Sequence, residues 1–142
     1  MSLERHMQEL LDIEAIRQVK ARYFRCMDTK DWDGFAKVFA EDAVADYSGP
    51  GKNLQGRAAI VAFVRGAVEA LKTVHHGHMP EIVVHGDSAH GIFAMADIVE
   101  RPGGRVMRGY GHYHEDFVRR DGRWQILRLR LTRLRVDRDA QP

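Results

Sequence analysis

The sequence has little cysteine, little net charge and no long apolar run. Cys26 is the only cysteine, which excludes an internal disulfide and a metal centre built from several cysteines, and suits a reducing compartment. The net charge of +2 is too near balance to predict a nucleic-acid or membrane partner. No run approaches the roughly 18 apolar residues of a membrane span, and the N-terminus lacks the apolar block of a signal peptide. We therefore expect a cytoplasmic protein.

What is present is typical of a soluble globular chain. Of its 142 residues, 44% are hydrophobic and 30% are charged. That length predicts one domain over residues 1–142, without a separate cofactor domain. The run SGPGK at 48–52 is a turn cluster inside this domain. Two features need an explanation: the chain has eight histidines, and arginine recurs between Arg119 and Arg138.

Apolar periodicity predicts three helices in the first half of the chain. Apolar residues recur at intervals of three and four before residue 28, at 35–39 and at 60–71. The first helix should end near Asp28. Asp31 is the expected N-cap of the second helix, which includes Phe39, because a carboxylate accepts hydrogen bonds from free backbone N–H groups. A strand is predicted at 43–47.

From residue 73 onward the pattern indicates strands. They are predicted at 73–78, 81–85, 89–100, 106–119 and 124–136. Turn signals separate them, including Pro80 and the hairpin turns at 102–104 and 121–122. Helices followed by a mostly antiparallel, curved sheet predict an α+β fold, with the helices on one face of the sheet and a hollow between the layers.

Two charged residues occupy positions that strand alternation turns inward. Asp97 has apolar neighbours on both strand faces, so it needs a partner, a proton or a wet cavity, unless the strand ends there and Asp97 reaches the surface. Arg133 follows in phase with the leucines at 127, 129 and 131, and points inward unless a bulge reverses the phase. An inward arginine suits Asp97, or an anionic or carbonyl ligand.

Three further residues combine into a possible acid–base arrangement. Tyr23 lies on the apolar stripe of the first helix, so its hydroxyl needs a partner, which in the simplest case is a backbone carbonyl. His75 shares a strand face with Thr73, and an imidazole suits proton transfer at neutral pH. Asp28 is unfavourable at a helix C-terminus unless a cation lies beside it. If that cation is His75, the carboxylate would fix one tautomer and expose the other ring nitrogen as a base.

The remaining histidines and arginines have simpler explanations. His76 and His78 share a strand face, as do His112 and His114, which is compatible with a zinc site but also with exposed strands. The arginines at 128 and 130 fit a solvated strand face, with a nucleic-acid surface as the alternative.

Four segments together resemble the SnoaL-like branch of the nuclear-transport-factor-2-like superfamily. They are DIEAIRQVKARYFRCMDTKDWD, ADYSG, VHHGHMPEI and DGRWQI, and the resemblance spans about residues 12–136. It is greatest to the bile-acid 7α-dehydratases, with scytalone dehydratases and hexachlorocyclohexane dehydrochlorinases further off. It implies a cone-shaped α+β barrel around a deep apolar pocket, usually assembled as a homotrimer, with a homodimer as the alternative.

The resemblance also implies site residues and a reaction. The catalytic residues would be His75, Asp28, Tyr23 and Tyr47, and the substrate-binding residues Asp97 and Arg133. No cofactor, metal, nucleic acid or membrane is implied. The expected reaction is the elimination of water from a small hydrophobic, cyclic or polycyclic carbonyl compound.

Two other functions remain open at this point. An isomerase of conjugated enones would need the same enolate. A non-catalytic module that binds a small hydrophobic ligand or a partner predicts that Asp28 and His75 lie too far apart to form a hydrogen bond. Scytalone itself is disfavoured as substrate, because Met27 and the residues around Gly111 replace polar side chains of the scytalone dehydratases.

Overall fold

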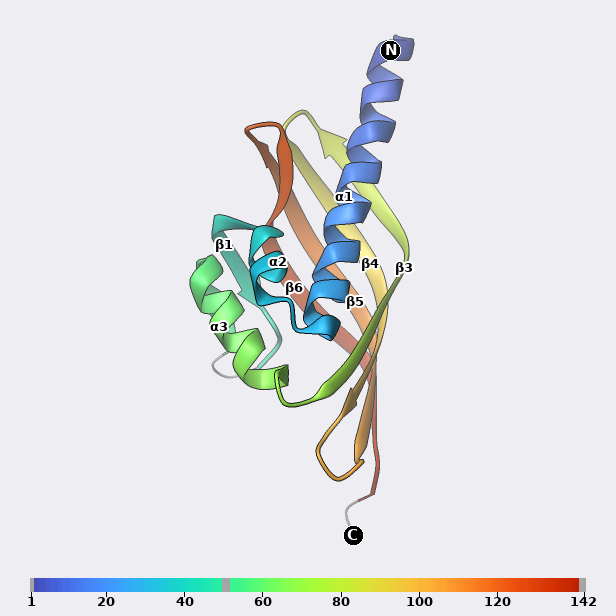
Figure 1. Cartoon of the computed structure of the whole chain (residues 1–142). Coiled ribbons are helices and arrows are strands. Elements are labelled where there is room, and N and C mark those ends of the chain that lie inside the picture. Colours follow the sequence, from blue (N-terminus) through green and yellow to red (C-terminus); the bar gives the residue numbers. More distant parts are fainter. Residues whose placement is uncertain (1, 50–51, 141–142) are drawn as a thin grey trace.

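The computed structural model describes residues 2–49 and 52–140, so the central part of the turn cluster at 48–52 lies outside the described residues. Three helices pack on one face of a six-stranded sheet (Figure 1). In chain order the elements are α1 (Leu3–Thr29), α2 (Trp32–Lys37), β1 (Phe39–Asp46), β2 (Asn53–Gln55), α3 (Arg57–Val68), β3 (Lys72–His85), β4 (Ser88–Glu100), β5 (Val106–Arg120) and β6 (Arg123–Arg138).

The sheet is mixed and open. Its strand order is β2-β1-β6-β5-β4-β3, where β1 and β6 are parallel and every other pair is antiparallel. Long strands β3 to β6 curve behind α1, whereas α2 and α3 lie beside β1 (Figure 1). The predicted α+β fold with a mostly antiparallel curved sheet is confirmed, and the cone is not closed into a barrel.

The helices differ from the prediction mainly at their ends. α1 starts at Leu3 and ends at Thr29, where Lys30 adopts a left-handed backbone with φ 62°. The Asp31 carboxylate accepts a hydrogen bond from Gly34 N–H, as predicted for the N-cap of α2. The assignment of Phe39 to this helix was wrong: α2 ends at Lys37 and Phe39 begins β1, where its side chain is fully buried.

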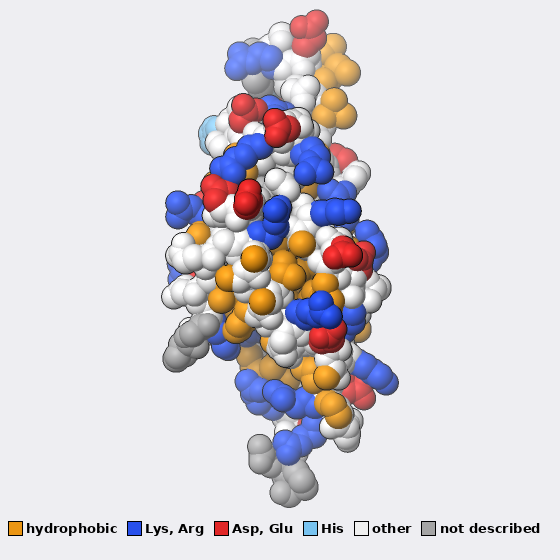
Figure 2. Space-filling view, turned by 60° about the vertical axis from the view of Figure 1, so that its left-hand side comes forward, with side chains coloured by type: hydrophobic (Ala, Val, Ile, Leu, Met, Phe, Trp, Pro, Cys, Tyr) orange, Lys and Arg blue, Asp and Glu red, His pale blue; other side chains and the backbone are white. Residues whose placement is uncertain are grey.

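The N-terminal turns of α1 project beyond the sheet (Figure 1). Apolar side chains of this end reach the surface (Figure 2), and the most exposed of them are Leu3, Met7, Leu10 and Leu11. Among the described residues, no helix has the length and apolar character needed to cross a membrane.

The strands predicted at 73–78 and 81–85 are one strand. β3 runs through Pro80, and its register against β4 shifts between His78 and Glu81. Proline is tolerated there because β3 is an edge strand and the irregularity leaves the missing N–H unneeded. The two-residue turn at Asp121 and Gly122, with φ 51° and 74°, joins β5 to β6 as predicted.

A bulge in β6 decides where Arg133 points. The pairing with β5 skips Leu134, because Gly111 pairs with Arg133 and Tyr110 with Arg135. Because the bulge comes after Arg133, the two-residue alternation is unbroken up to this residue. Arg133 therefore lies on the same face of the sheet as the buried Leu129 and Leu131. Leu134 is turned outward and is 79% exposed.

Candidate active site

The C-terminal end of α1 and the start of β3 form the first part of the site. Asp28 Oδ1 lies 2.7 Å from His75 Nδ1, and Asp28 Oδ2 accepts a hydrogen bond from the His75 backbone N–H at 2.7 Å. Thr73 donates to Asp28 Oδ1, and Lys30 Nζ donates to the Thr73 hydroxyl. The carboxylate at this helix end is thus held by three groups of β3, and these contacts compensate for its unfavourable place in the helix dipole.

The hydrogen bond to Asp28 determines which nitrogen of His75 is free. A carboxylate accepts the proton of Nδ1–H, so Nε2 is the unprotonated nitrogen of the neutral ring. Phe24 stacks on the imidazole with ring centroids 6.0 Å apart. His75 is 9% exposed. Packing and hydrogen bonds therefore fix the ring with Nε2 directed away from Asp28.

Asp97 and Arg133 form the second part of the site. Asp97 is 3% exposed, and Arg133 binds both of its oxygens, at 3.0 and 2.8 Å. The hydrogen bond from Arg133 to Asp97 raises the pKa of the arginine, which stays charged. His75 Nε2 lies 3.7 Å from Asp97 Oδ2, longer than a hydrogen bond. Because Arg133 occupies the carboxylate, Nε2 is left available to another group.

A glycine makes room for this ion pair. Gly109 on β5 pairs with Asp97, and a Cβ at this position would collide with Arg133 Nη1 and Asp97 Oδ1. Its neighbour in the inward row, Gly111, lies against the backbone of Thr132. The two glycines open the floor of the site on β5, where larger side chains would fill the space.

Tyr23 and Tyr47 form the third part of the site. Their hydroxyls are hydrogen-bonded at 2.8 Å, so Tyr23 finds a side chain and not the backbone carbonyl of the simplest expectation. Burial raises the pKa of both phenols well above the ordinary value, and the neighbouring Tyr113 raises both further. Both phenols therefore keep their protons at neutral pH, and in their mutual hydrogen bond one of them donates to the other.

Tyr113 connects the tyrosines to the ion pair, although the sequence pattern does not single it out. Its ring lies 5.6 Å from that of Tyr23, and its side chain is 2% exposed. Burial raises its pKa, with smaller contributions from the charges of Asp97 and Glu115. The sequence of β5 does contain an indication of its role. Its inward positions are Gly109, Gly111 and Tyr113, so two residues without side chains leave space beside a phenol.

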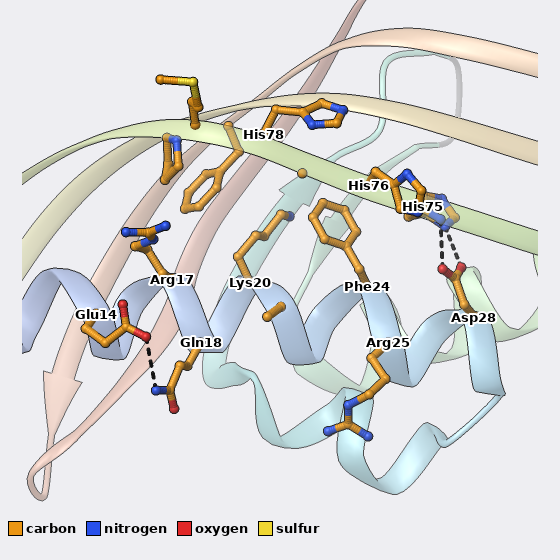
Figure 3. A pocket seen from close by; sticks show the side chains of 15 residues that line it. Glu14, Arg17, Gln18, Lys20, Phe24, Arg25, Asp28, His75, His76 and His78 are labelled. Carbon is orange, nitrogen blue, oxygen red and sulfur yellow. Dashed lines mark hydrogen bonds and ion pairs between the residues drawn. The ribbon is translucent and has the colours of Figure 1, made fainter.

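A groove meets this site from outside. It lies between α1 and β3, has a volume of about 590 Å³, and has Asp28 and His75 toward one end (Figure 3). Lys20, Phe24 and His78 are also among its lining residues. Tyr23, Tyr47, Asp97 and Arg133 do not line this groove, so it approaches the dyad from the Asp28 side.

The predicted site residues are therefore brought together in two connected groups. One consists of the hydrogen-bonded pairs Asp28–His75 and Asp97–Arg133, which face each other across 3.7 Å, and the other is the pair Tyr23 and Tyr47. In the part of the chain that the structure describes, no three histidine, cysteine or acidic side chains are grouped as metal ligands. His76 and His78 have ring centroids 6.4 Å apart, and His112 and His114 6.2 Å.

The late arginines are largely occupied by acids. Arg120 binds Asp42 at 2.6 Å, and Arg135 binds Asp137 at 2.8 Å. On the face seen in Figure 2, basic and acidic side chains are interspersed. Arg128 and Arg130 are both exposed, which fits the solvated strand face expected from the sequence.

Comparisons with known proteins agree with this architecture. The SnoaL-like domain family matches residues 8–130. A Gibberella zeae protein named as a probable cyclase is 27% identical over 133 residues, which cover 84% of this chain and 89% of that protein.

Solved structures superpose over nearly the whole chain. The hexachlorocyclohexane dehydrochlorinase LinA type 2 has a TM-score of 0.84 at 18% identity, covering 92% of this chain and 90% of that one. A candidate scytalone dehydratase of Novosphingobium aromaticivorans has a TM-score of 0.81 at 24% identity, covering 94% and 91%. A Mycobacterium tuberculosis protein of unknown function reaches 0.81 at 26% identity, covering 95% and 78%.

The structural likenesses establish the fold, and the family match extends over most of the chain. The chain belongs to the SnoaL-like domain family of the nuclear-transport-factor-2-like superfamily.

Proposed function

We propose that this protein is a cofactor-independent lyase that eliminates water from a hydrophobic cyclic or polycyclic substrate with an activating carbonyl. The observation that carries the proposal is the His75 imidazole. One of its nitrogens is fixed by Asp28, and the other faces the charge-balanced pair of buried Asp97 and partly exposed Arg133 without being bonded to it. This is the geometry of an oriented base with an unoccupied lone pair.

His75 performs the proton transfers in this reaction. Nε2 removes a proton from the carbon next to the carbonyl, and the electron pair of the C–H bond moves onto the carbonyl oxygen as an enolate. The imidazolium that forms is stabilised by Asp28 at 2.7 Å. When the enolate collapses, the C–O bond breaks, a C=C bond forms, and the proton on Nε2 leaves with the hydroxyl as water. No electron acceptor is needed, because elimination is redox-neutral.

Tyr23 and Tyr47 stabilise the enolate. Their mutual hydrogen bond shows that both hydroxyls reach the same point, and their raised pKa keeps the donor protons in place. A carbonyl oxygen that binds there takes the place of their mutual hydrogen bond and accepts from both hydroxyls, and these hydrogen bonds strengthen as charge develops. Buried donors of this kind contribute roughly 3–4 kcal/mol each to transition-state stabilisation.

Asp97 orients the departing hydroxyl. As a carboxylate held by Arg133, it accepts hydrogen bonds but donates none. It lies 3.7 Å from Nε2, so a substrate hydroxyl that contacts both atoms is directed toward the proton it will take. Arg133 supplies the counter-charge of this buried carboxyl group and two hydrogen bonds to it.

Support comes from this geometry and from the resemblance to dehydratases, whereas the similar proteins do not share one reaction. These include a probable cyclase, a dehydrochlorinase and a candidate aromatic ring hydroxylase, so one fold serves several reactions.

The experiment is a substrate screen with mass detection. Purified protein is incubated with hydroxylated steroid and polyketide ketones, and products that have lost one water are sought. We expect such a product, and its formation should be abolished in His75→Ala and strongly reduced in Tyr23→Phe. Full turnover by either variant, with a native circular dichroism spectrum, would overturn the mechanism.

The same screen separates the two alternatives. Deuterium incorporation from solvent without loss of water would identify an enone isomerase. Saturable binding without exchange or turnover would identify a ligand-binding module. The hydrogen bond between Asp28 and His75 favours the enzymes over the binding module, which has no need of an oriented imidazole.

We also propose that the protein is a homotrimer, as the resemblance implies. Light scattering coupled to gel filtration tests this, and a dimer or monomer mass would contradict it.

A further inference from the structure

A buried ion pair lies beneath α1, outside the residues used above. Lys20 Nζ is 2.5 Å from Glu115 Oε1, and the two side chains are 2% and 0% exposed. Neither Lys20 Nζ nor either Glu115 oxygen has a further hydrogen-bond partner among the described residues. A buried pair with so few hydrogen bonds recovers little of its desolvation cost, and apolar residues of similar volume often serve stability as well. Stability alone does not account for this pair.

The other contacts of the ammonium group are aromatic faces. Lys20 Nζ lies 3.4 Å from the ring centroid of Tyr113 and 3.7 Å from that of Tyr23. The Phe24 ring is further away, at 4.9 Å. In Figure 3, Lys20 rises from α1 beside Phe24 toward the sheet. Glu115 thus fixes a cation against the faces of two phenol rings, one of which carries the Tyr23 hydroxyl.

A cation at this position acts on the hydroxyl. Positive charge over the ring face is attracted by the π electrons and stabilises negative charge that develops on the phenol oxygen. The O–H group becomes a stronger donor, and water does not screen the effect because Lys20 is buried. Through the 2.8 Å hydrogen bond, the same polarisation reaches Tyr47.

We infer that Lys20, fixed by Glu115, is a positioning residue that polarises the Tyr23 phenol for its role as donor to the substrate carbonyl. The inference rests on the proposed function, because a stronger Tyr23 donor matters only if Tyr23 donates a hydrogen bond to the substrate carbonyl. Lys20 of α1, held in place by Glu115 of β5, would thus strengthen the Tyr23 hydroxyl as a donor without touching the substrate itself.

The protonation of Lys20 makes the effect measurable. Burial lowers the pKa of its ammonium group to about 8, against the opposing effect of Glu115. The titratable groups that face it are Glu115 and Tyr113 from β5 and Tyr23 from its own helix. On its groove side lie Glu14, Arg17 and the histidines at 76 and 78. Lys20 is thus largely a cation at neutral pH and loses its charge before the tyrosines do.

The first experiment needs no substrate. The protein is labelled with ¹³Cζ-tyrosine, and the Tyr23 and Tyr113 resonances are assigned with Tyr→Phe variants. In the wild type both should shift between pH 7 and 9 with a midpoint near the pKa of Lys20, about 8. Tyr110, 38% exposed and without a cation contact to Lys20, is the internal control. Resonances of Tyr23 that stay constant through this range would overturn the inference.

The second experiment removes the charges together. Lys20→Met/Glu115→Gln keeps the volumes and leaves no unpaired buried charge. The matched control is Arg120→Gln/Asp42→Asn, which removes an exposed ion pair distant from the proposed chemistry. With a substrate from the screen, the first variant should lose about tenfold in kcat with little change in KM, and the tyrosine transition near pH 8 should disappear. The control should match the wild type.

The outcomes separate this inference from the proposed function. If no hydroxyketone turns over, the proposed function fails, and the pH response of wild-type Tyr23 still decides whether Lys20 acts on it. If the Lys20→Met/Glu115→Gln variant folds and keeps the wild-type kcat, the pair is structural only and the inference is wrong.

Discussion

The carboxylate of Asp28 binds both the imidazole ring and the backbone N–H of His75. Oδ1 lies 2.7 Å from Nδ1, and Oδ2 accepts from the backbone N–H at the same distance. The side chain that sets the tautomer therefore also pins the edge strand β3 to the end of α1. Loss of either oxygen acceptor should disturb orientation as well as charge.

Asp28→Asn tests this double role. The amide can present its oxygen to only one of the two donors, and it does not stabilise an imidazolium. We expect kcat on the screened substrate to fall roughly 10²- to 10⁴-fold, the range of a general base that loses its function. ¹⁵N spectra should report an Nδ1–H tautomer of His75 in the wild type and a mixture in the variant. A single Nδ1–H tautomer with wild-type kcat in Asp28→Asn would contradict the prediction.

Arg133 should contribute to the stability of the fold, because it is the hydrogen-bond partner of the buried Asp97 carboxylate. Arg133→Met leaves a 3% exposed carboxylate without its two hydrogen bonds. Since the arginine side chain is itself 27% exposed and water can enter, we expect a loss of roughly 1–3 kcal/mol in the free energy of unfolding. Asp97→Asn added to Arg133→Met should recover most of this loss. Urea denaturation of the two single variants and the double variant measures the coupling, and additive effects would show that the pair is not the cause.

Alternation along the strands predicted the inward positions of Asp97 and Arg133 because each lies in an unbroken two-residue phase. The prediction for Arg133 holds because the bulge at Leu134 comes one residue later. The contact of Asp28 with His75 was predicted from a local conflict, a carboxylate at the wrong end of a helix. Such conflicts are visible in a sequence because the rule they break is local.

Contacts between distant elements are not visible in this way. Lys20 and Glu115 each look like an ordinary charged residue on an amphipathic element, and nothing in either segment shows that they are buried together. The pairing of the Tyr23 and Tyr47 hydroxyls likewise depends on how the residue that follows β1 is placed relative to α1. The continuity of β3 through Pro80 escaped prediction because proline ends most strands, whereas an edge position permits it.

Lys20 should leave a signature in the pH dependence of stability. Burial lowers its pKa from 10.5 in the unfolded chain to about 8 in the fold, so between these values the unfolded state binds more protons. Stability contributed by this group therefore rises with pH across that window. Between about pH 8 and 10 the wild type should gain roughly 1–3 kcal/mol relative to Lys20→Met/Glu115→Gln. Urea unfolding at constant ionic strength measures the difference, and a gap that does not change with pH would refute the assignment.

Alanine substitutions at the glycines of β5 should reduce stability by different amounts, because a new Cβ would meet side chains at Gly109 and backbone at Gly111. A Cβ at Gly109 would collide with the ends of the Arg133 and Asp97 side chains, which can move aside only by separating. Gly109→Ala should therefore fold, lose roughly 1–3 kcal/mol of stability by overpacking, and lose activity with the ion pair.

Two other glycines supply the comparison for Gly109→Ala. At Gly111 the obstruction is the backbone of Thr132, which cannot turn away, so Gly111→Ala should disrupt the pairing of β5 with β6 and cost more stability. At Gly66 in α3 no atom lies within reach of a new Cβ, and Gly66→Ala should stabilise by roughly 0.5–1 kcal/mol because alanine favours a helix. Thermal and urea denaturation of the three variants gives the order. If Gly109→Ala kept full activity, the ion pair of Asp97 and Arg133 would not be part of the catalytic arrangement.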